Sequence, residues 1–266
     1  MLLFGDYLVV LVINLILNMK TEKFITIGDP SEELKTIQVI VLSLSNAAQK
    51  ITQFTTHSGL HITLPPLLLS ASKAMSLVSI NGTKTPIEII ALSTRNTFEL
   101  YTRLVHLIKS EENCQAWREE AVTDQKQIYD GILTIEGPKS LKNTIQMERK
   151  RVERHAQKKG LGLNRKIPHF KKLAVEAGLE SEYDAFFKLY SKFVHPSSFV
   201  VNWPEASSTP MYRSAFIFNI QQYGLLMLER LDTEFSIKAE ELVLNAKNVV
   251  EGILGNINDG RKPLIH

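Results

Sequence analysis

The sequence predicts an all-α protein, and three observations support that prediction. Apolar residues recur at three- and four-residue spacing along most of the chain, and helix start and stop signals separate the apolar segments. No strand-like alternation extends beyond the short stretch Ile62–Leu64. With 266 residues, 44% of them hydrophobic and 22% charged, the chain is long enough to bury a substantial core. We therefore expect a single bundle of about eight helices.

Residues 1–19 form an apolar segment that is distinct from the expected bundle. The segment has neither the basic start nor the small-residue cleavage site of a signal peptide. The 18 residues from Leu2 to Met19 are at the lower limit for a membrane span, and Lys20 and Lys23 would keep the following domain in the cytoplasm. Three alternatives remain: an inner-membrane anchor, a buried helix, or a misassigned start with Met19 rather than Met1 as the true first residue.

Residues 20–266 are expected to form one all-α domain whose helices are delimited by proline, glycine and capping residues. Asp29-Pro30-Ser31-Glu32 combines an N-cap, a proline at the first helical position and an acid at the third, and Thr85-Pro86-Ile87-Glu88 repeats that pattern. Pro65-Pro66 is expected to open a shorter apolar helix, and Gly160 to end a basic one. The expected helices span about residues 30–54, 65–81, 86–108, 111–135, 138–159, 168–177, 181–195, 210–230 and 233–254.

The helix over residues 86–108 carries the first half of a candidate site. Its apolar residues cover more than half of its circumference, so we expect it at the centre of the bundle. The remaining narrow stripe holds Arg95, Glu99 and Arg103 at four-residue intervals. One interpretation is a solvated ladder of ion pairs, each stabilising the helix by roughly 0.2–0.5 kcal/mol. The other is a network that faces a second helix or lines a cleft.

The helix over residues 181–195 supplies the second half. Aromatic residues form its apolar side, and Ser191 and His195 share the opposite stripe. Because Pro196 disfavours helical geometry at the residue before it, we expect His195 at the C-terminal end of the helix. His195 could pair with Glu99 or be positioned by Ser191, and it could then act as a general acid. The alternative is a capping histidine with a structural hydrogen bond.

The middle of the chain is strongly basic. Residues 139–172 hold twelve Lys or Arg and two acids, whereas the whole chain has a net charge of only +3. Such a helix and loop can contact phosphates without sequence preference. The alternatives are a solvated helix or, if the N-terminal segment is an anchor, a surface against acidic lipid headgroups. The candidate nucleic-acid-binding residues are Lys142, Arg149, Lys150, Arg154, Lys158, Arg165 and Lys166.

The sequence offers little for metal or cofactor chemistry. The single cysteine, Cys114, excludes an internal disulfide framework and a cysteine-based zinc site. His57 and His61 flank a glycine and have no third ligand nearby, so no metal site is expected there. The chain contains no P-loop, dinucleotide-binding fingerprint, zincin motif or Gly-x-Ser-x-Gly elbow, which argues against the common nucleotide-dependent and hydrolase classes. We therefore expect no metal and no cofactor.

The order of these motifs resembles a known family. An Arg-x3-Glu pair in an apolar helix, a long basic middle and a Tyr-Ser…His-Pro-Ser segment are similar to the helical bacterial proteins grouped as domain of unknown function 5677. The resemblance covers about residues 85–230 and implies an all-α fold and a site at the shared residues, but it implies no activity. The residues that carry it are Arg95, Glu99, Tyr190, Ser191, His195, Pro196 and Ser197.

A looser likeness is to HEPN-type helical ribonucleases and toxins, which use an Arg-x4-6-His motif against RNA. Arg95-Asn96 resembles the start of that motif, but Leu100, Tyr101 or Thr102 stands where the histidine is needed. Arg149-x5-His155 meets the spacing. However, a histidine inside a basic run often meets this spacing by chance.

The sequence therefore suggests a cytoplasmic, nucleic-acid-directed protein of the bacterial phage-defence or toxin kind, with metal-independent ribonuclease activity. Arg95 would bind phosphate, Glu99 would orient its partner, Ser191 would position the imidazole, and His195 would act as acid or base. The alternative is a non-enzymatic helical interaction module in which the same residues are structural; if residues 1–19 are an anchor, this module would lie at the cytoplasmic side of the inner membrane. The sequence carries no signal of the oligomeric state.

Overall fold

The computed structural model describes residues 20–53, 59–166 and 168–258, and every regular element in these ranges is helical. The all-α prediction is confirmed. Nine helices in the described ranges have seven or more residues: α2 (Pro30–Thr52), α3 (Gly59–Ser76), α4 (Ile87–Leu107), α5 (Glu111–Leu133), α6 (Lys139–Lys158), α7 (Phe170–Ala177), α9 (Lys188–Val194), α12 (Pro210–Phe235) and α13 (Ala239–Asn258). Shorter elements are η1 (Glu22–Phe24), η2 (Leu77–Ser79), η3 (Gly82–Lys84), α8 (Glu180–Glu182), η4 (Tyr183–Phe187), α10 (Ser198–Asn202) and α11 (Pro204–Ser207).

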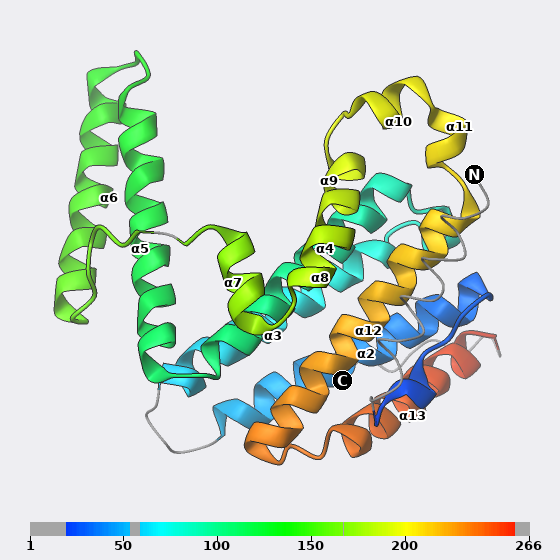
Figure 1. Cartoon of the computed structure of the whole chain (residues 1–266). Coiled ribbons are helices and arrows are strands. Elements are labelled where there is room, and N and C mark those ends of the chain that lie inside the picture. The colour runs from blue at the N-terminus through cyan, green and yellow to red at the C-terminus, as the bar shows by residue number, and fades with distance from the viewer. Residues whose placement is uncertain (1–19, 54–58, 167, 259–266) are drawn as a thin grey trace.

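Helix α4 lies at the centre of the fold, as its broad apolar surface predicts. It packs against α3, α9 and α12, while α2 packs against α3, α12 and α13 (Figure 1). Leu44, Leu68, Phe98 and Leu228, from four of these helices, are fully buried in one continuous core. The core therefore joins helices from both ends of the chain around α4.

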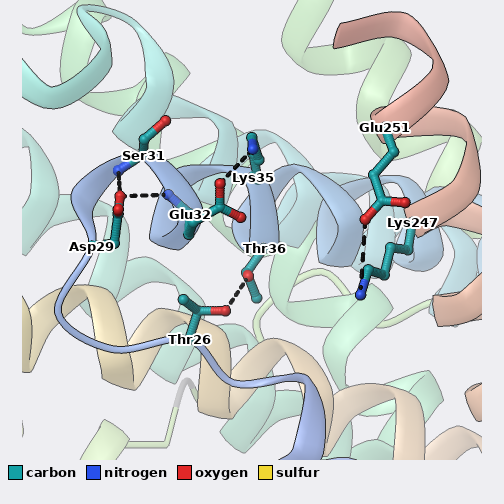
Figure 2. Close-up of polar contacts among 8 residues, drawn as sticks. All are labelled: Thr26, Asp29, Ser31, Glu32, Lys35, Thr36, Lys247 and Glu251. Atoms are coloured by element: carbon teal, nitrogen blue, oxygen red, sulfur yellow. Dashed lines mark hydrogen bonds and ion pairs between the residues drawn. The ribbon is translucent and has the colours of Figure 1, made fainter. Parts of the chain in front are cut away.

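The start of α2 has the predicted capping chemistry. The Asp29 carboxylate accepts hydrogen bonds from the backbone N–H groups of Ser31 at 2.8 Å and Glu32 at 3.1 Å (Figure 2). Pro30 occupies the first helical position, where its missing donor has no cost. A hydrogen bond of 2.8 Å between the hydroxyls of Thr26 and Thr36 then fixes the preceding segment against the helix.

Helix α3 begins earlier than Pro65-Pro66 predicts. The helix starts at Gly59, so both prolines and the strand-like stretch Ile62–Leu64 lie inside it. Proline removes a backbone donor and normally weakens a helix interior. Here Leu67 and Leu68, one turn further on, are buried in the core, and tertiary packing of this kind contributes more to helix stability than local preference does.

The membrane-anchor, buried-helix and misassigned-start alternatives concern residues 1–19, which lie outside the described residues. Among the described helices, one stretch, Gly59–Ser79, has the length and hydropathy of a membrane span. Because 56% of an 18-residue window of this stretch is buried inside the protein, the stretch has the character of a core helix.

The start of α4 differs from its prediction, because Thr85 does not cap the helix. The Thr85 side chain is buried and donates a hydrogen bond of 2.6 Å to the carbonyl of Val78, and Pro86 takes the N-cap position. Within α4, the buried hydroxyls of Thr94 and Thr97 donate to carbonyls four residues earlier, at 2.7 and 2.8 Å. These bonds allow polar residues to lie on a buried face of the central helix.

Helices α5 and α6 form a hairpin that projects from the rest of the fold, at the left of Figure 1. Helix α6 packs on α5 rather than on the helices of the main core. Gly160 follows α6 with φ +64°, so it ends the helix as predicted. We call this α5–α6 hairpin the arm.

The predicted helix over residues 181–195 is interrupted by a π-helical turn, η4, between α8 and α9. Such a turn inserts one extra residue per turn and rotates the side chains that follow it. The prediction of His195 at the helix end is confirmed, since its φ of −106° and ψ of 151° are extended.

The C-terminal helices differ from their prediction in position. The break expected near residues 231–233 lies at Ser236–Lys238, where Ser236 and Lys238 have φ of 51° and 58°. Asp232 supports the turn by accepting from the Lys238 backbone N–H at 2.6 Å. Without a glycine, this stop has no sequence signal, and the short α10 and α11 were also not predicted.

Candidate functional site

Arg95 on α4 is held on two sides. Its Nε donates a hydrogen bond of 2.9 Å to the Glu99 carboxylate one turn along the helix. Its guanidinium carbon lies 4.7 Å from the centre of the Phe187 ring, in cation–π geometry. The Arg95 side chain keeps 24% of its surface exposed. The two contacts therefore fix the plane of the guanidinium without removing it from solvent.

His195 reaches the same place from α9. It is an exposed residue in extended conformation at the helix end. The turn that carries it is fixed by Ser197, whose hydroxyl donates to the Lys192 carbonyl at 2.6 Å and whose backbone N–H donates to the His195 carbonyl at 2.6 Å. Ser197 also caps α10 by accepting from Val200 N–H at 3.4 Å.

The two halves meet through Arg95 and His195. Arg95 Nη1 lies 3.4 Å from His195 Nε2. An arginine N–H can donate only to an imidazole nitrogen that carries no proton, so this contact matches the neutral tautomer protonated at Nδ1. Because 3.4 Å is longer than an optimal hydrogen bond, the pair is loosely engaged and accessible to a ligand oxygen that could contact both groups. We call Arg95, Glu99 and His195 the arginine–histidine cluster.

Two expected contacts of His195 differ in the structure. The Ser191 hydroxyl donates a hydrogen bond of 2.9 Å to the Phe187 carbonyl of the π-helical segment. The Ser191 side chain is therefore engaged with the backbone and does not hold the His195 imidazole. Glu99 pairs with Arg95, and His195 contacts Arg95 rather than the carboxylate. The arginine therefore lies between the two groups that the sequence suggested would pair.

The predicted ladder of ion pairs along α4 is present only in its first half. Arg103 pairs with Glu120 of α5 instead of Glu99. Burial raises the pKa of Glu120, and the nearby Arg103 opposes that shift. The Arg103 guanidinium also lies 5.8 Å from the Trp117 ring centre. Arg103 thus joins α4 to the base of the arm.

An open groove of about 790 Å³ runs beside the cluster, between α3, α4, α5 and the start of α7. Glu99 borders this groove as well as pairing with Arg95. The groove is lined by Ser70, Lys73, Ala74, Leu77, Asn96, Glu99, Leu100, Arg103, Trp117, Pro168 and Phe170. We call it the Trp117 groove. Its size is within the range of small-molecule sites.

The part of the chain that holds these features matches a family model. The model of a family of unknown function, DUF5677, matches residues 68–202, just over half of the chain. The chain belongs to this family. The DUF5677 match starts and ends earlier than the resemblance over residues 85–230 predicts. No curated protein and no solved structure matches the chain.

The DUF5677 region contains the arginine–histidine cluster, the Trp117 groove and the whole arm. Helices α12 and α13 lie outside it, yet α12 supplies part of the core behind the cluster. Its Asn219 donates a hydrogen bond of 2.9 Å to the buried Tyr190 hydroxyl. Burial raises the pKa of Tyr190, which keeps the phenol neutral over the physiological range.

The basic residues of the DUF5677 region divide into two groups. Arg149 is engaged by Asp130 at 2.6 Å and Glu153 at 3.2 Å, and Arg165 lies 3.7 Å from Glu119. These arginines stabilise the arm and its loop. In contrast, Lys150, Arg154 and Lys158 are exposed at four-residue intervals on α6, while Lys142 is half-buried on α6 and Lys166 is exposed in the following loop.

The arm and the arginine–histidine cluster are separate features. The arm has two hollows, of about 660 and 420 Å³. Residues of α5 and α6 line the first and residues of α6 line the second, and Arg151 and Arg154 border both. The Arg149-x5-His155 motif lies here, with Arg149 already paired. Within the described residues, no group of three His, Cys, Asp or Glu side chains could hold a metal ion. His57 lies outside the described residues.

Several residues at the site have no signal in the sequence. Phe187 lies under Arg95 because the π-helical turn brings it there, and Lys73 and Trp117 reach the groove from α3 and α5. Asn219, which reaches Tyr190 from α12, was likewise not predicted. Such contacts depend on tertiary packing, which spacing along the chain does not encode.

Proposed function

We propose that this protein is a metal-independent ribonuclease in which Arg95 binds the scissile phosphate and His195 transfers a proton. The observation that carries the proposal is the 3.4 Å approach of Arg95 Nη1 to His195 Nε2 at an exposed position beside an open groove. A planar guanidinium suits a phosphate because it donates two parallel hydrogen bonds. An imidazole transfers protons near neutral pH.

RNA suits a site with few catalytic groups, because its 2′-hydroxyl supplies the nucleophile. The 2′-hydroxyl oxygen attacks the neighbouring phosphorus and loses its proton, while the bond from phosphorus to the 5′-oxygen breaks and that oxygen gains a proton. The products are a 2′,3′-cyclic phosphate and a 5′-hydroxyl. His195 would make one of the two proton transfers, and Arg95 would stabilise the charge that develops on the phosphate.

Glu99 has a positioning role in this proposal. It engages the Nε of Arg95, so a phosphate would approach the terminal nitrogens, of which Nη1 faces His195 Nε2. Phe187 stacks under the same guanidinium and limits its rotation. Pre-arranged groups of this kind avoid reorganisation during the reaction.

The test uses one oligonucleotide in two forms. The folded wild-type protein is incubated with single-stranded RNA in EDTA, and separately with the same sequence carrying 2′-deoxyribose throughout. We expect cleavage of the RNA alone, with 2′,3′-cyclic phosphate ends detected by mass spectrometry. Equal cleavage of the DNA, or 5′-phosphate products, would contradict the mechanism.

A second function is supported by the Phe187 contact. The stack of Arg95 on Phe187 joins α4 to the π-helical segment, which is also what a structural network would do. In this alternative the protein is a non-enzymatic helical module, and the exposed Lys and Arg side chains of the arm bind a partner or a membrane. RNA as substrate favours the cytoplasm, whereas an anchor in residues 1–19 would place the domain at the inner membrane's cytoplasmic face.

A further inference from the structure

Among the residues that the structure describes, one cation of the Trp117 groove has no acidic partner. Among the described residues, Lys73 forms no ion pair, while the other charged residues of the lining are engaged: Glu99 with Arg95 and Arg103 with Glu120. Lys73 is exposed on α3. A single available ammonium group at the edge of a groove attracts an anionic group such as a phosphate.

The walls of the groove are suited to a flat, apolar-faced ring. Trp117 and Phe170 contribute aromatic rings, and Leu77 and Leu100 contribute aliphatic surface. Arg103, held by Glu120, lies 5.8 Å from the centre of the Trp117 ring and restrains it. Nucleobases stack on aromatic side chains of this kind without sequence preference.

A second polar group of the groove, Asn96, has no side-chain partner among the described residues. It lines the groove one residue after Arg95. A primary amide offers both a donor and an acceptor, which matches the polar edge of a heterocyclic base.

We infer that the Trp117 groove binds the base and one phosphate of a single nucleotide. The base would stack on Trp117 and meet the Asn96 amide, and the phosphate would contact Lys73. Because Glu99 borders both features, a strand in the groove would continue toward the arginine–histidine cluster. The inference rests on the proposed function for its polymeric substrate, but binding of a mononucleotide tests it independently.

The experiment follows binding of adenosine 5′-monophosphate by tryptophan fluorescence. The chain has two tryptophans, so Trp203→Phe leaves Trp117 as the only reporter. We expect saturable quenching by the nucleotide in EDTA, and weaker quenching by adenosine or inorganic phosphate alone. Inorganic phosphate binding as tightly as the nucleotide would overturn the base-stacking assignment.

Lys73→Ala and Asn96→Ala test the two polar contacts. Each should weaken nucleotide binding by about tenfold, the size of one charge-assisted or well-placed hydrogen bond. Adenosine binding should not change with Lys73→Ala. Lys84→Ala is the matched control, because Lys84 is an exposed lysine outside the groove. Equal effects of the two lysine variants would overturn the inference.

His195→Ala separates this inference from the proposed function. The variant should lose RNA cleavage and keep nucleotide-dependent quenching of Trp117. Nucleotide binding without any RNA cleavage by the wild-type protein would reject the ribonuclease alone. RNA cleavage without nucleotide binding would reject the groove alone.

Discussion

Arg95 Nη1 lies 3.4 Å from His195 Nε2, although the two residues are 100 positions apart in the chain. The approach depends on three local features: the phase of α4, the π-helical turn before α9, and the extended backbone at His195. The arginine therefore comes from α4 and the histidine from the end of α9, two separate helices of the chain.

Arg95 should also stabilise the packing of α4 against the π-helical segment. Arg95→Ala removes the stack on Phe187 and the ion pair with Glu99, and we expect a loss of about 1–2 kcal/mol in the free energy of unfolding. Arg95→Lys should recover only part of this loss, because an ammonium lacks the planar stacking surface. Urea denaturation measures both values.

A double-mutant cycle with Phe187→Leu isolates the stack. We expect Arg95 and Phe187 to be coupled by about 0.5–1 kcal/mol. Additive effects of the two substitutions would show that the 4.7 Å stack contributes nothing to stability.

Gly224 should be the least replaceable glycine of the core. A Cβ added there would lie 2.5 Å from Ile40 Cγ2 and 2.8 Å from Met75 Cε. The methionine end can move, but the branched isoleucine is stiff, so Gly224→Ala should destabilise the protein by about 1–3 kcal/mol despite the better helix propensity of alanine.

Gly131 supplies the matched control. It lies inside α5, and a Cβ there would meet nothing within 4 Å. Gly131→Ala should therefore stabilise the protein by about 0.5–1 kcal/mol. Thermal melts of both variants test the pair, and a Gly224→Ala protein as stable as the wild type would mean that α2, α3 and α12 pack less tightly than described.

The parts of the fold predicted from sequence are those specified by neighbouring residues. Asp29 caps α2 with its own side chain, Gly160 ends α6 in a left-handed conformation, and Pro196 makes His195 extended. Each of these effects acts within a few residues, so spacing alone was sufficient to predict them.

The parts that could not be predicted depend on contacts between distant segments. Pro65 lies inside α3 because core packing outweighs its local cost, and Arg103 leaves the ladder on α4 because Glu120 of α5 is available. For the site, the sequence provided Arg95 and His195 as candidates on separate helices. It provided neither Phe187 nor the direct contact between the two residues, because both depend on a π-helical turn without a sequence signal.

Alkaline pH should destabilise the protein through its buried tyrosines. Burial raises the pKa of Tyr101 to about 12, and it raises the pKa values of Tyr190 and Tyr223 further. The folded state then holds protons that the unfolded chain loses near pH 10, so stability is fully present below pH 10 and falls as pH rises above it. Each group contributes up to about 1.4 kcal/mol of this loss per pH unit.

Urea denaturation between pH 9 and 11 measures this loss. Absorbance at 295 nm gives an independent check, because three of the seven tyrosines should ionise only when the protein unfolds. Ionisation of all seven near pH 10 in the folded protein would contradict the burial of these side chains.

The exposed Lys and Arg side chains of the arm should contribute to RNA affinity without sequence specificity. Replacing Lys150, Arg154 and Lys158 by alanine should weaken binding of single-stranded RNA. It should also reduce the slope of log affinity against log salt by about 2, since each contact with a single strand contributes about 0.7. Fluorescence anisotropy at several salt concentrations measures the slope.

A control with the same change in net charge uses three paired lysines, two of which, Lys35 and Lys247, are drawn in Figure 2. Lys23, Lys35 and Lys247 are each paired with an acid, so their joint replacement should leave the salt slope nearly unchanged. An equal fall in slope for both triple variants would mean that net charge, not the arm, attracts RNA.

The proposed mechanism requires Arg95 and His195 to act together on a phosphodiester. The most direct measurement is the rate of RNA cleavage by His195→Ala in EDTA, with the melting temperature recorded on the same sample. We predict a rate at least about 100-fold below that of the wild type, with an unchanged melting temperature, because His195 is exposed and a proton-transfer group contributes this much. An unchanged cleavage rate, or a wild-type protein that cleaves no RNA, would contradict this mechanism.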